Sequence, residues 1–229
     1  MQHYFSGAQA LSGVELYAGP FIRREGASLK YVEQQVQRLV YNLNFPSRIG
    51  MQTPFTNFTI LLDSAKRKLD SEWAVAGGER VGLLSEFTGE AKLFVLALAR
   101  VLGYGDGVGQ PFTFPIPTLM ATSKMLYEDS EVFDTIFSTT AKRGSFYWLN
   151  SRIVDPDSSY AMCCRLSIDG KELGYVNAVD VFDASDFSRR RFGGLWSIPD
   201  ATGSIGVVTV NLPRVVLESK GEDAMFYER

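Results

Sequence analysis

Helical periodicity alternates with short apolar runs along this chain, and that alternation constrains the fold more than any other feature. In three segments apolar residues recur at spacings of three and four, which predicts amphipathic helices. Between them lie short runs rich in β-branched and aromatic residues, which are typical of buried strands. The alternation predicts an α/β fold. The predicted helices span residues 28–44, 85–102 and 130–143, and the predicted strands span residues 58–62, 146–149 and 207–210.

Three further segments are less regular. Residues 4–18 carry apolar residues roughly on one side, which predicts a weak helix that Gly19-Pro20 stops. The glycines of residues 103–109 follow a helix instead of opening one, so they predict a helix stop and not a dinucleotide loop. Residues 110–118 hold three prolines, each of which removes a ladder donor, so a central antiparallel strand is not expected there. Irregular apolar backbone of this kind lies either against a site or on a proline-rich surface.

Composition excludes several classes of function. The net charge of −3 gives no strong field for nucleic acid or an acidic membrane. No apolar run approaches the roughly 20 residues of a membrane span, and the start has no basic-then-apolar leader, so we expect a reducing cytoplasm. The single histidine, His3, rules out histidine metal clusters, and two adjacent cysteines cannot build a four-thiolate zinc site. The 229 residues are enough for one large domain or two small ones, and no metal is expected in residues 1–229.

The two cysteines, Cys163 and Cys164, are adjacent and lie between turn signals. If the segment is extended, their side chains point to opposite faces, so at most one sulfur faces any one partner. Nothing else in the chain supplies redox or radical chemistry so readily. Two plainer interpretations stay open, because free cysteines are often simply buried and a vicinal pair can close a strained disulfide.

An uncharged polar segment runs from Gln52 to Asn57, just before the predicted strand at 58–62. Polar groups in such an apolar neighbourhood need partners. The segment is either a substrate-lining turn or a turn whose polar groups satisfy one another. A second polar turn, Thr202 to Ser204, precedes the predicted strand at 207–210.

Four stretches together resemble the anaerobic, class III, ribonucleoside-triphosphate reductases, which are glycyl-radical enzymes. The resemblance spans about residues 4–214, and the stretches occur in the order of the family. They are Asn42-Leu43-Asn44-Phe45-Pro46-Ser47-Arg48 with Gln52-Thr53-Pro54-Phe55-Thr56-Asn57, then residues 111–118, then Met162-Cys163-Cys164-Arg165-Leu166, then residues 203–214.

The resemblance implies part of a ten-stranded α/β barrel with an interior finger loop that carries the reactive cysteine. It implies that Cys164, directly before the arginine, becomes a thiyl radical that takes the 3′ hydrogen of the ribose. The neighbouring Cys163 and the two polar turns are then substrate-binding candidates. Ser204 stands where many relatives have an asparagine, and serine cannot offer the same amide pair. The substrate-binding candidates are Cys163, Thr53, Asn57, Gly203 and Ser204.

The family also has a regulatory cone, a zinc site of four cysteines and a C-terminal glycyl-radical loop, none of which we expect in these 229 residues. The resemblance therefore implies partners: a ribonucleoside triphosphate, a missing C-terminal half, a radical-SAM activating enzyme, formate or a thioredoxin-type dithiol, and a second copy in a homo-oligomer. A partner-binding half-barrel without catalysis is one rival, because open sheet edges recruit strands. A thiol-disulfide protein and acyl chemistry of the pyruvate formate-lyase type are the others.

Overall fold

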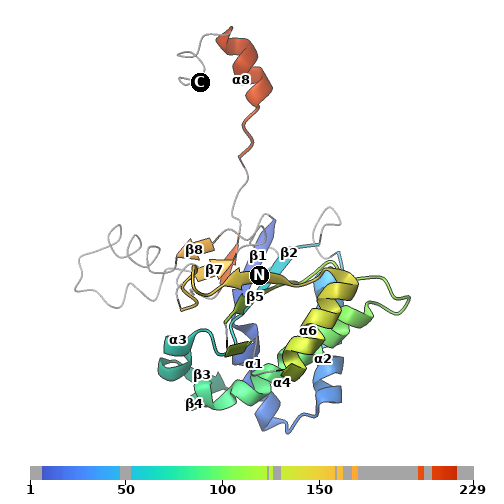
Figure 1. The fold of residues 1–229 in the computed structure, drawn as a ribbon, viewed down its shortest axis with the longest axis vertical. Helices are drawn as coiled ribbons and strands as arrows, with labels where there is room; N and C mark the ends of the chain where they lie inside the picture. The colour runs from blue at the N-terminus through green and yellow to red at the C-terminus, as the bar shows by residue number, and fades with distance from the viewer. Residues whose placement is uncertain are drawn as a thin grey trace, which may run out of the picture.

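A computed structural model describes most of the chain (Figure 1). The described residues are 7–46, 53–122, 124–125, 130–157, 159–161, 167–169, 201–203 and 208–220. Among these, no helix is both long and apolar enough to cross a membrane.

A five-stranded sheet organises the fold, in the order β6-β5-β2-β1-β9. Four neighbouring strands run parallel, and β9 is antiparallel to β1. The structure is therefore a mixed α/β fold with a parallel sheet, as the alternation predicts, while the ten-stranded barrel and its finger loop remain predictions. The strands are β1 (Ala8–Ser12), β2 (Phe55–Ile60), β5 (Ile116–Ala121), β6 (Tyr147–Asn150) and β9 (Ala201–Gly203).

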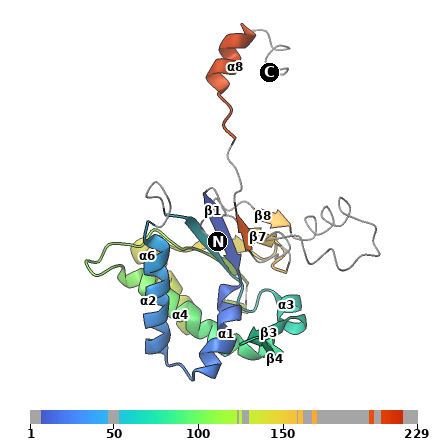
Figure 2. The ribbon, with the colours of Figure 1, turned by 180° about the vertical axis from the view of Figure 1, so that it is seen from behind.

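Helices α1 (Val14–Arg24), α2 (Leu29–Asn44), α4 (Thr88–Tyr104) and α6 (Ser130–Arg143) form the helical layer of the molecule. Figures 1 and 2 show α2, α4 and α6 together on one side of the sheet. The predicted N-cap of α2 is confirmed, because the Ser28 side chain accepts a hydrogen bond from the backbone N–H of Tyr31. Helix α4 contacts α1, α2 and α6, so its apolar residues fill the centre of the layer.

Smaller elements complete the described chain. A short helix α3 (Lys66–Ser71), a hairpin of β3 (Trp73–Ala76) and β4 (Glu79–Leu83), and a 3₁₀ turn η1 (Leu84–Phe87) follow β2. A second hairpin pairs β7 (Ser159–Ala161) with β8 (Ser167–Asp169). Helix α8 (Leu212–Ser219) stands apart from the α/β body in both ribbon views (Figures 1 and 2).

The prediction of one weak helix over residues 4–18 is wrong. Residues 8–12 form β1, which pairs with β2, and α1 begins only at Val14. Gly13 separates the two elements with a left-handed φ of 68°, a conformation that glycine adopts without strain. The sequence predicts a connector over residues 21–26, but Pro20 lies inside α1 instead of ending it, and residues 21–24 are helical.

The prediction of a buried strand over residues 207–210 is also wrong for the part that the structure describes. Val208 is 92% exposed and Val210 is 65% exposed, and neither belongs to a strand. A buried strand needs a neighbouring strand edge, and no described strand pairs with Val208 or Val210. Asn211 instead caps α8, accepting a hydrogen bond from the Arg214 backbone N–H at 3.0 Å.

Two smaller expectations need correction. Residues 116–118 are not irregular: they open β5, a parallel strand, and pairing with β6 begins only at Thr118, one residue after Pro117. The helical spacing of residues 130–143 predicts that Phe137 faces inward, but Phe137 is 48% exposed and stacks on Trp148 at 5.0 Å between ring centroids.

Two helical glycines test the packing of α1 against η1. A Cβ on Gly19 lies 2.8 Å from the Phe87 Cβ, whereas a Cβ on Gly89 meets nothing within 4 Å. We expect Gly19→Ala to destabilise the chain by about 1–3 kcal/mol through overpacking. The matched control Gly89→Ala should stabilise α4 by about 0.5–1 kcal/mol. Denaturant unfolding measures both, and an equal effect of the two substitutions would contradict the close contact.

Candidate functional site

The sheet has two chemically different faces. Along β2, Phe58 and Ile60 belong to the apolar core on the helix side, while Asn57 and Thr59 alternate with them and face the other way. The register carries this division to the neighbouring strands, because Thr59 is opposite Thr118 of β5 and Ser12 of β1. We call the surface opposite the helices the inner face; its described members on β1, β2 and β5 are Ala8, Ala10, Ser12, Phe55, Asn57, Thr59, Ile116, Thr118 and Met120.

A directional hydrogen-bond network crosses the inner face. Thr59 Oγ1 donates to Asn57 Oδ1 at 3.4 Å, and Asn57 Nδ2 donates to Thr118 Oγ1 at 2.9 Å. All three side chains are buried. Ser12, in the same row of the sheet, is also buried, but its Oγ has no partner among the described residues. The inner face is therefore uncharged in its described members on β1, β2 and β5, and it carries one row of polar side chains, formed by Ser12, Thr59 and Thr118, with Asn57 beside it.

The β7–β8 hairpin lies next to this face. Strand β7 contacts both β1 and β2, and Figures 1 and 2 show the hairpin on the side of the sheet away from α2 and α6. Ser159 pairs with Asp169, and Ala161 pairs with Ser167, so residues 162–166 connect two paired strands. On β1, the inward residues Ala8 and Ala10 are small, which allows the backbone of another strand to approach closely.

The amino-terminal edge of the sheet brings together two of the sequence motifs. Asn44, the last residue of α2, accepts hydrogen bonds from the backbone N–H groups of Thr113 and Phe114 at 3.0 Å each. Its Nδ2 donates to the carbonyl oxygens of Val40 and Phe114. The centroids of the Phe55 and Phe114 rings also lie 5.3 Å apart. One side-chain amide thus satisfies the irregular backbone before β5.

The structure separates the predicted site residues into three groups. Asn57 lies at the centre of the inner-face network. Thr53 is not there: its hydroxyl donates to the Asn44 carbonyl oxygen at 3.4 Å, beside α2. Gly203 pairs with Gln9 on β1, so β1 alone separates it from β2. Cys163, Cys164 and Ser204 lie outside the described residues.

Sequence reasoning missed Ser12, Thr59 and Thr118. Thr118 lies in the segment of residues 110–118, and the prediction for that segment rested on its three prolines and not on the Thr118 hydroxyl. Ser12 lay within the mispredicted helix over residues 4–18. Alternation along correctly assigned strands would have found all three, because each lies on the same face as Asn57.

A second buried polar group lies beyond the carboxyl ends of β1 and β2. Glu15 Oε1 accepts hydrogen bonds from the backbone N–H groups of Leu61 at 2.7 Å and Leu62 at 3.0 Å, while its Oε2 has no partner in the described part of the chain. Complete burial raises the pKa of the Glu15 carboxyl above its ordinary range, and these two hydrogen bonds and nearby Lys68 oppose the rise without cancelling it. Leu62 has a left-handed φ of 47°, so the carboxylate secures a strained turn.

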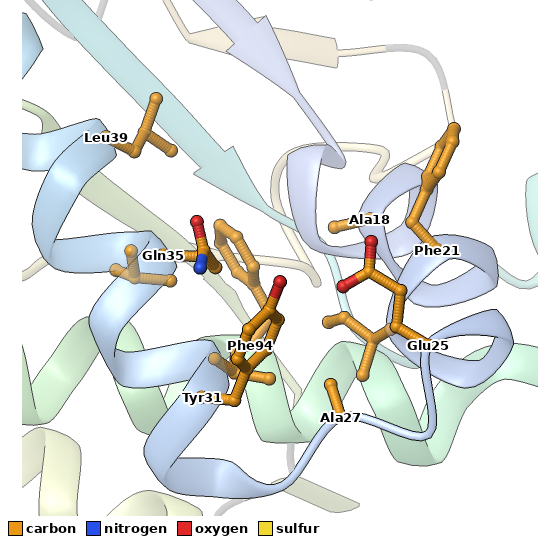
Figure 3. Close-up of a pocket in the computed structure, with 11 residues that line it drawn as sticks. Ala18, Phe21, Glu25, Ala27, Tyr31, Gln35, Leu39 and Phe94 are labelled. Atoms are coloured by element: carbon orange, nitrogen blue, oxygen red, sulfur yellow. The ribbon is translucent and has the colours of Figure 1, made fainter.

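An apolar groove of about 250 Å³ lies in the helical layer, between α1 and α2 and above Phe94 of α4 (Figure 3). Its polar lining consists mainly of Glu25, Tyr31 and Gln35. The Glu25 carboxylate raises the pKa of the Tyr31 phenol above its ordinary value. This groove has no cysteine in its lining and lies on the helix side of the sheet. Within the described ranges, no group of three or more His, Cys, Asp or Glu side chains could hold a metal ion.

Comparison with known proteins gives one family. The family model for anaerobic ribonucleoside-triphosphate reductase matches residues 1–229, which confirms the resemblance of the sequence motifs. No curated protein sequence matches the chain. A crystal structure of the anaerobic ribonucleotide reductase from Thermotoga maritima, with citrate in the active site, is 22% identical with a TM-score of 0.48. The alignment covers 97% of this chain and 36% of that chain, so this chain spans about a third of that reductase.

The Asn44 amide can be tested by removal. Asn44→Ala leaves two backbone N–H groups and a carbonyl of the segment before β5 without their partner, so we expect a loss of about 2 kcal/mol or more in unfolding free energy. Gln34→Ala, which removes an exposed amide of the same helix, is the control and should change stability by less than about 0.5 kcal/mol. Similar unfolding midpoints for the two variants would contradict the role of Asn44.

Glu15 predicts a pH dependence of stability. Because the pKa of Glu15 is raised in the folded chain, Glu15 ionises at a lower pH in the unfolded chain than in the folded chain. The free energy of unfolding therefore falls as the pH rises from the unfolded-state pKa through the folded-state pKa. We expect Glu15→Gln to remove this fall, since an amide oxygen still accepts from Leu61 and Leu62. Glu79→Gln removes a charge from the exposed β3–β4 hairpin and should keep the fall. Thermal unfolding across a pH series measures both, and parallel curves for the two variants would refute the assignment.

Proposed function

The chain belongs to the anaerobic ribonucleoside-triphosphate reductase family. From that membership we propose that it forms part of the catalytic barrel of an enzyme that reduces ribonucleoside triphosphates to 2′-deoxyribonucleoside triphosphates. Cys164 is the proposed catalytic residue, and Cys163, Thr53, Asn57, Gly203 and Ser204 are the proposed substrate-binding residues. The proposed location of the enzyme is the cytoplasm.

The proposed reaction begins with a hydrogen-atom transfer. The Cys164 thiol gives its hydrogen atom to the glycyl radical, which becomes an ordinary glycine and leaves a thiyl at Cys164. The Cys164 sulfur then takes the hydrogen atom from C3′ of the ribose, the C2′–O bond breaks, and the 2′ hydroxyl leaves as water with one added proton. Formate, oxidised to carbon dioxide, or a dithiol, oxidised to a disulfide, supplies the two electrons. Return of the hydrogen atom to C3′ regenerates the thiyl.

The observation that carries this proposal is the contact of β7 with β1 and β2 beside an uncharged inner face. A hairpin whose connecting residues are 162–166 is thereby held next to a buried polar surface. A carbon-centred radical needs a site that excludes water, and a sulfur needs near-attack distance to C3′ and little acid-base help. Buried Asn57 and Thr118 offer neutral hydrogen-bonding groups of the kind that suits a ribose.

The completed barrel is proposed to need further chain. The antiparallel pairing of β9 with β1 fits the junction between two halves of a ten-stranded barrel, with β1, β2, β5 and β6 in one half. We propose that a C-terminal half, which carries the glycyl radical, is supplied in trans. A radical-SAM activating enzyme and a second copy of the chain are further proposed partners.

One observation favours a second candidate function, a partner-binding half-barrel without catalysis. Apolar residues just after β9 and in α8 are exposed, and such residues offer a surface to another chain. In this alternative the chain is a binding module, and Cys163 and Cys164 have no radical role. The exposed residues are Val208, Val210, Leu212, Val216 and Leu217.

A reconstitution assay separates the two candidates. The chain is mixed under anaerobic conditions with a chain that carries the C-terminal half, an activating enzyme with S-adenosylmethionine, formate and ribonucleoside triphosphates, and deoxynucleotides are measured. We expect product only in the complete mixture, and none after Cys164→Ser, since a hydroxyl does not replace a thiyl. Cys163→Ser is the matched control and should retain turnover at a reduced rate.

Three outcomes of this assay are informative. Turnover by this chain alone would refute the need for a second half. Turnover by the Cys164→Ser variant would refute the assigned radical residue. A stable complex that never makes product, even with an active glycyl radical, would support the binding module instead.

A further inference from the structure

Ser12 carries a buried hydroxyl that no described part of the fold uses. The residue is 4% exposed, and its Oγ has no hydrogen-bond partner among the described residues. A buried polar group without a partner is costly, and natural proteins retain few of them. Alternation along β1 places Ser12 on the inner face, since Leu11 before it packs against the core on the helix side.

Thr118 offers a second unused donor on the same face. Its Oγ1 accepts a hydrogen bond from Asn57 Nδ2 at 2.9 Å. Asn57 is held in that orientation because its Oδ1 accepts from Thr59. The acceptor side of the Thr118 hydroxyl is therefore occupied, and its hydrogen is left to donate elsewhere. No described residue accepts that hydrogen.

The two hydroxyls lie in one row across the sheet. Thr59 is opposite both Ser12 and Thr118, so the two residues lie on strands separated by β2. With neighbouring strands about 4.8 Å apart, their backbones are roughly 10 Å apart. Their ligand therefore needs two separate acceptors and no negative charge, because the described members of this face include no Lys or Arg.

We propose that Ser12 and Thr118 are substrate-binding residues that donate hydrogen bonds to the neutral nucleoside half of the ribonucleotide, meaning the sugar oxygens and the base carbonyl oxygens. This inference rests on the proposed function and adds two residues to its site. Because the triphosphate is negatively charged, it binds outside the row of Ser12, Thr59 and Thr118, next to positively charged groups. Asn57, itself a proposed substrate-binding residue, also aligns the Thr118 hydroxyl through the hydrogen bond that its Nδ2 donates.

The test combines binding with stability. Removing a ligand-facing hydroxyl that has no partner should raise the melting temperature and weaken binding, whereas removing a structural hydroxyl should lower the melting temperature and leave binding unchanged. Ser12→Ala deletes the unpaired hydroxyl, so it should raise the melting temperature by about 2–4 °C. The same variant should weaken binding of ATP or CTP by about 2–10-fold, the worth of one hydrogen bond. Thr118→Val, which keeps the shape of the side chain, should also weaken binding by about 2–10-fold.

Thr139→Val is the matched control. Thr139 is a buried threonine in α6 whose hydroxyl donates to the Ala99 carbonyl oxygen at 2.9 Å, far from the inner face. This variant should lower the melting temperature and leave nucleotide binding unchanged. Isothermal titration of the 229-residue chain with ATP, CTP, adenosine and tripolyphosphate measures binding. The two inner-face variants should lose affinity for the nucleotides and adenosine, and keep wild-type affinity for tripolyphosphate.

Several results would overturn the inference. A wild-type chain that binds none of the nucleotides, or variants that bind them as tightly as the wild type, would show that the hydroxyls are only packing defects. Weakened tripolyphosphate binding would place the phosphates on this face instead. Deoxynucleotide formation with unchanged binding in both variants would refute this inference alone. Weakened nucleotide binding without any turnover would refute only the proposed reaction.

Discussion

The alternation of side chains along β2 is the constraint on which the rest of the structure depends. Phe58 and Ile60 must face the helices, and that requirement turns Asn57 and Thr59 to the inner face. A slip of one residue would exchange the two sets completely. The side-chain bond from Asn57 to Thr118 fixes the register with β5, and the bond from Gln9 to Thr56 at 2.8 Å fixes the register with β1. The same pattern that builds the core therefore builds the candidate site.

Polar groups define the ends of the sheet as well as its inner face. At the amino-terminal edge, the Asn44 amide takes the place of a strand partner for Phe114, so a proline-rich segment can enter β5 without losing its hydrogen bonds. Beyond the carboxyl ends, the Glu15 carboxylate holds the turn at Leu62 despite the cost of burying a charge. Both side chains are acceptors for consecutive backbone N–H groups, which an apolar residue cannot replace.

The sequence predicted the elements whose pattern is local. Helices α2 and α6 follow from periodicity over more than ten residues and from the cap at Ser28. Strand β1 was missed because five residues give too short a pattern, and only its partner β2 makes it a strand. Asn57 was found because it belongs to a motif, but its link to Thr118 spans 61 positions and depends on register. The unpaired state of Ser12 is a property of packing that no sequence pattern encodes.

The two candidate functions depend on the same surface. The proposed barrel needs strands beyond β9, and the exposed Val208 and Val210 lie further along the chain from that strand. A second chain that packed on these valines would bury apolar surface that is exposed here. Partner binding belongs to both candidate functions: it precedes catalysis in the proposed reductase and is the whole activity of the binding module. What distinguishes a reductase from a binding module is the chemistry that follows assembly, and the chemistry proposed above depends on the sulfur of Cys164.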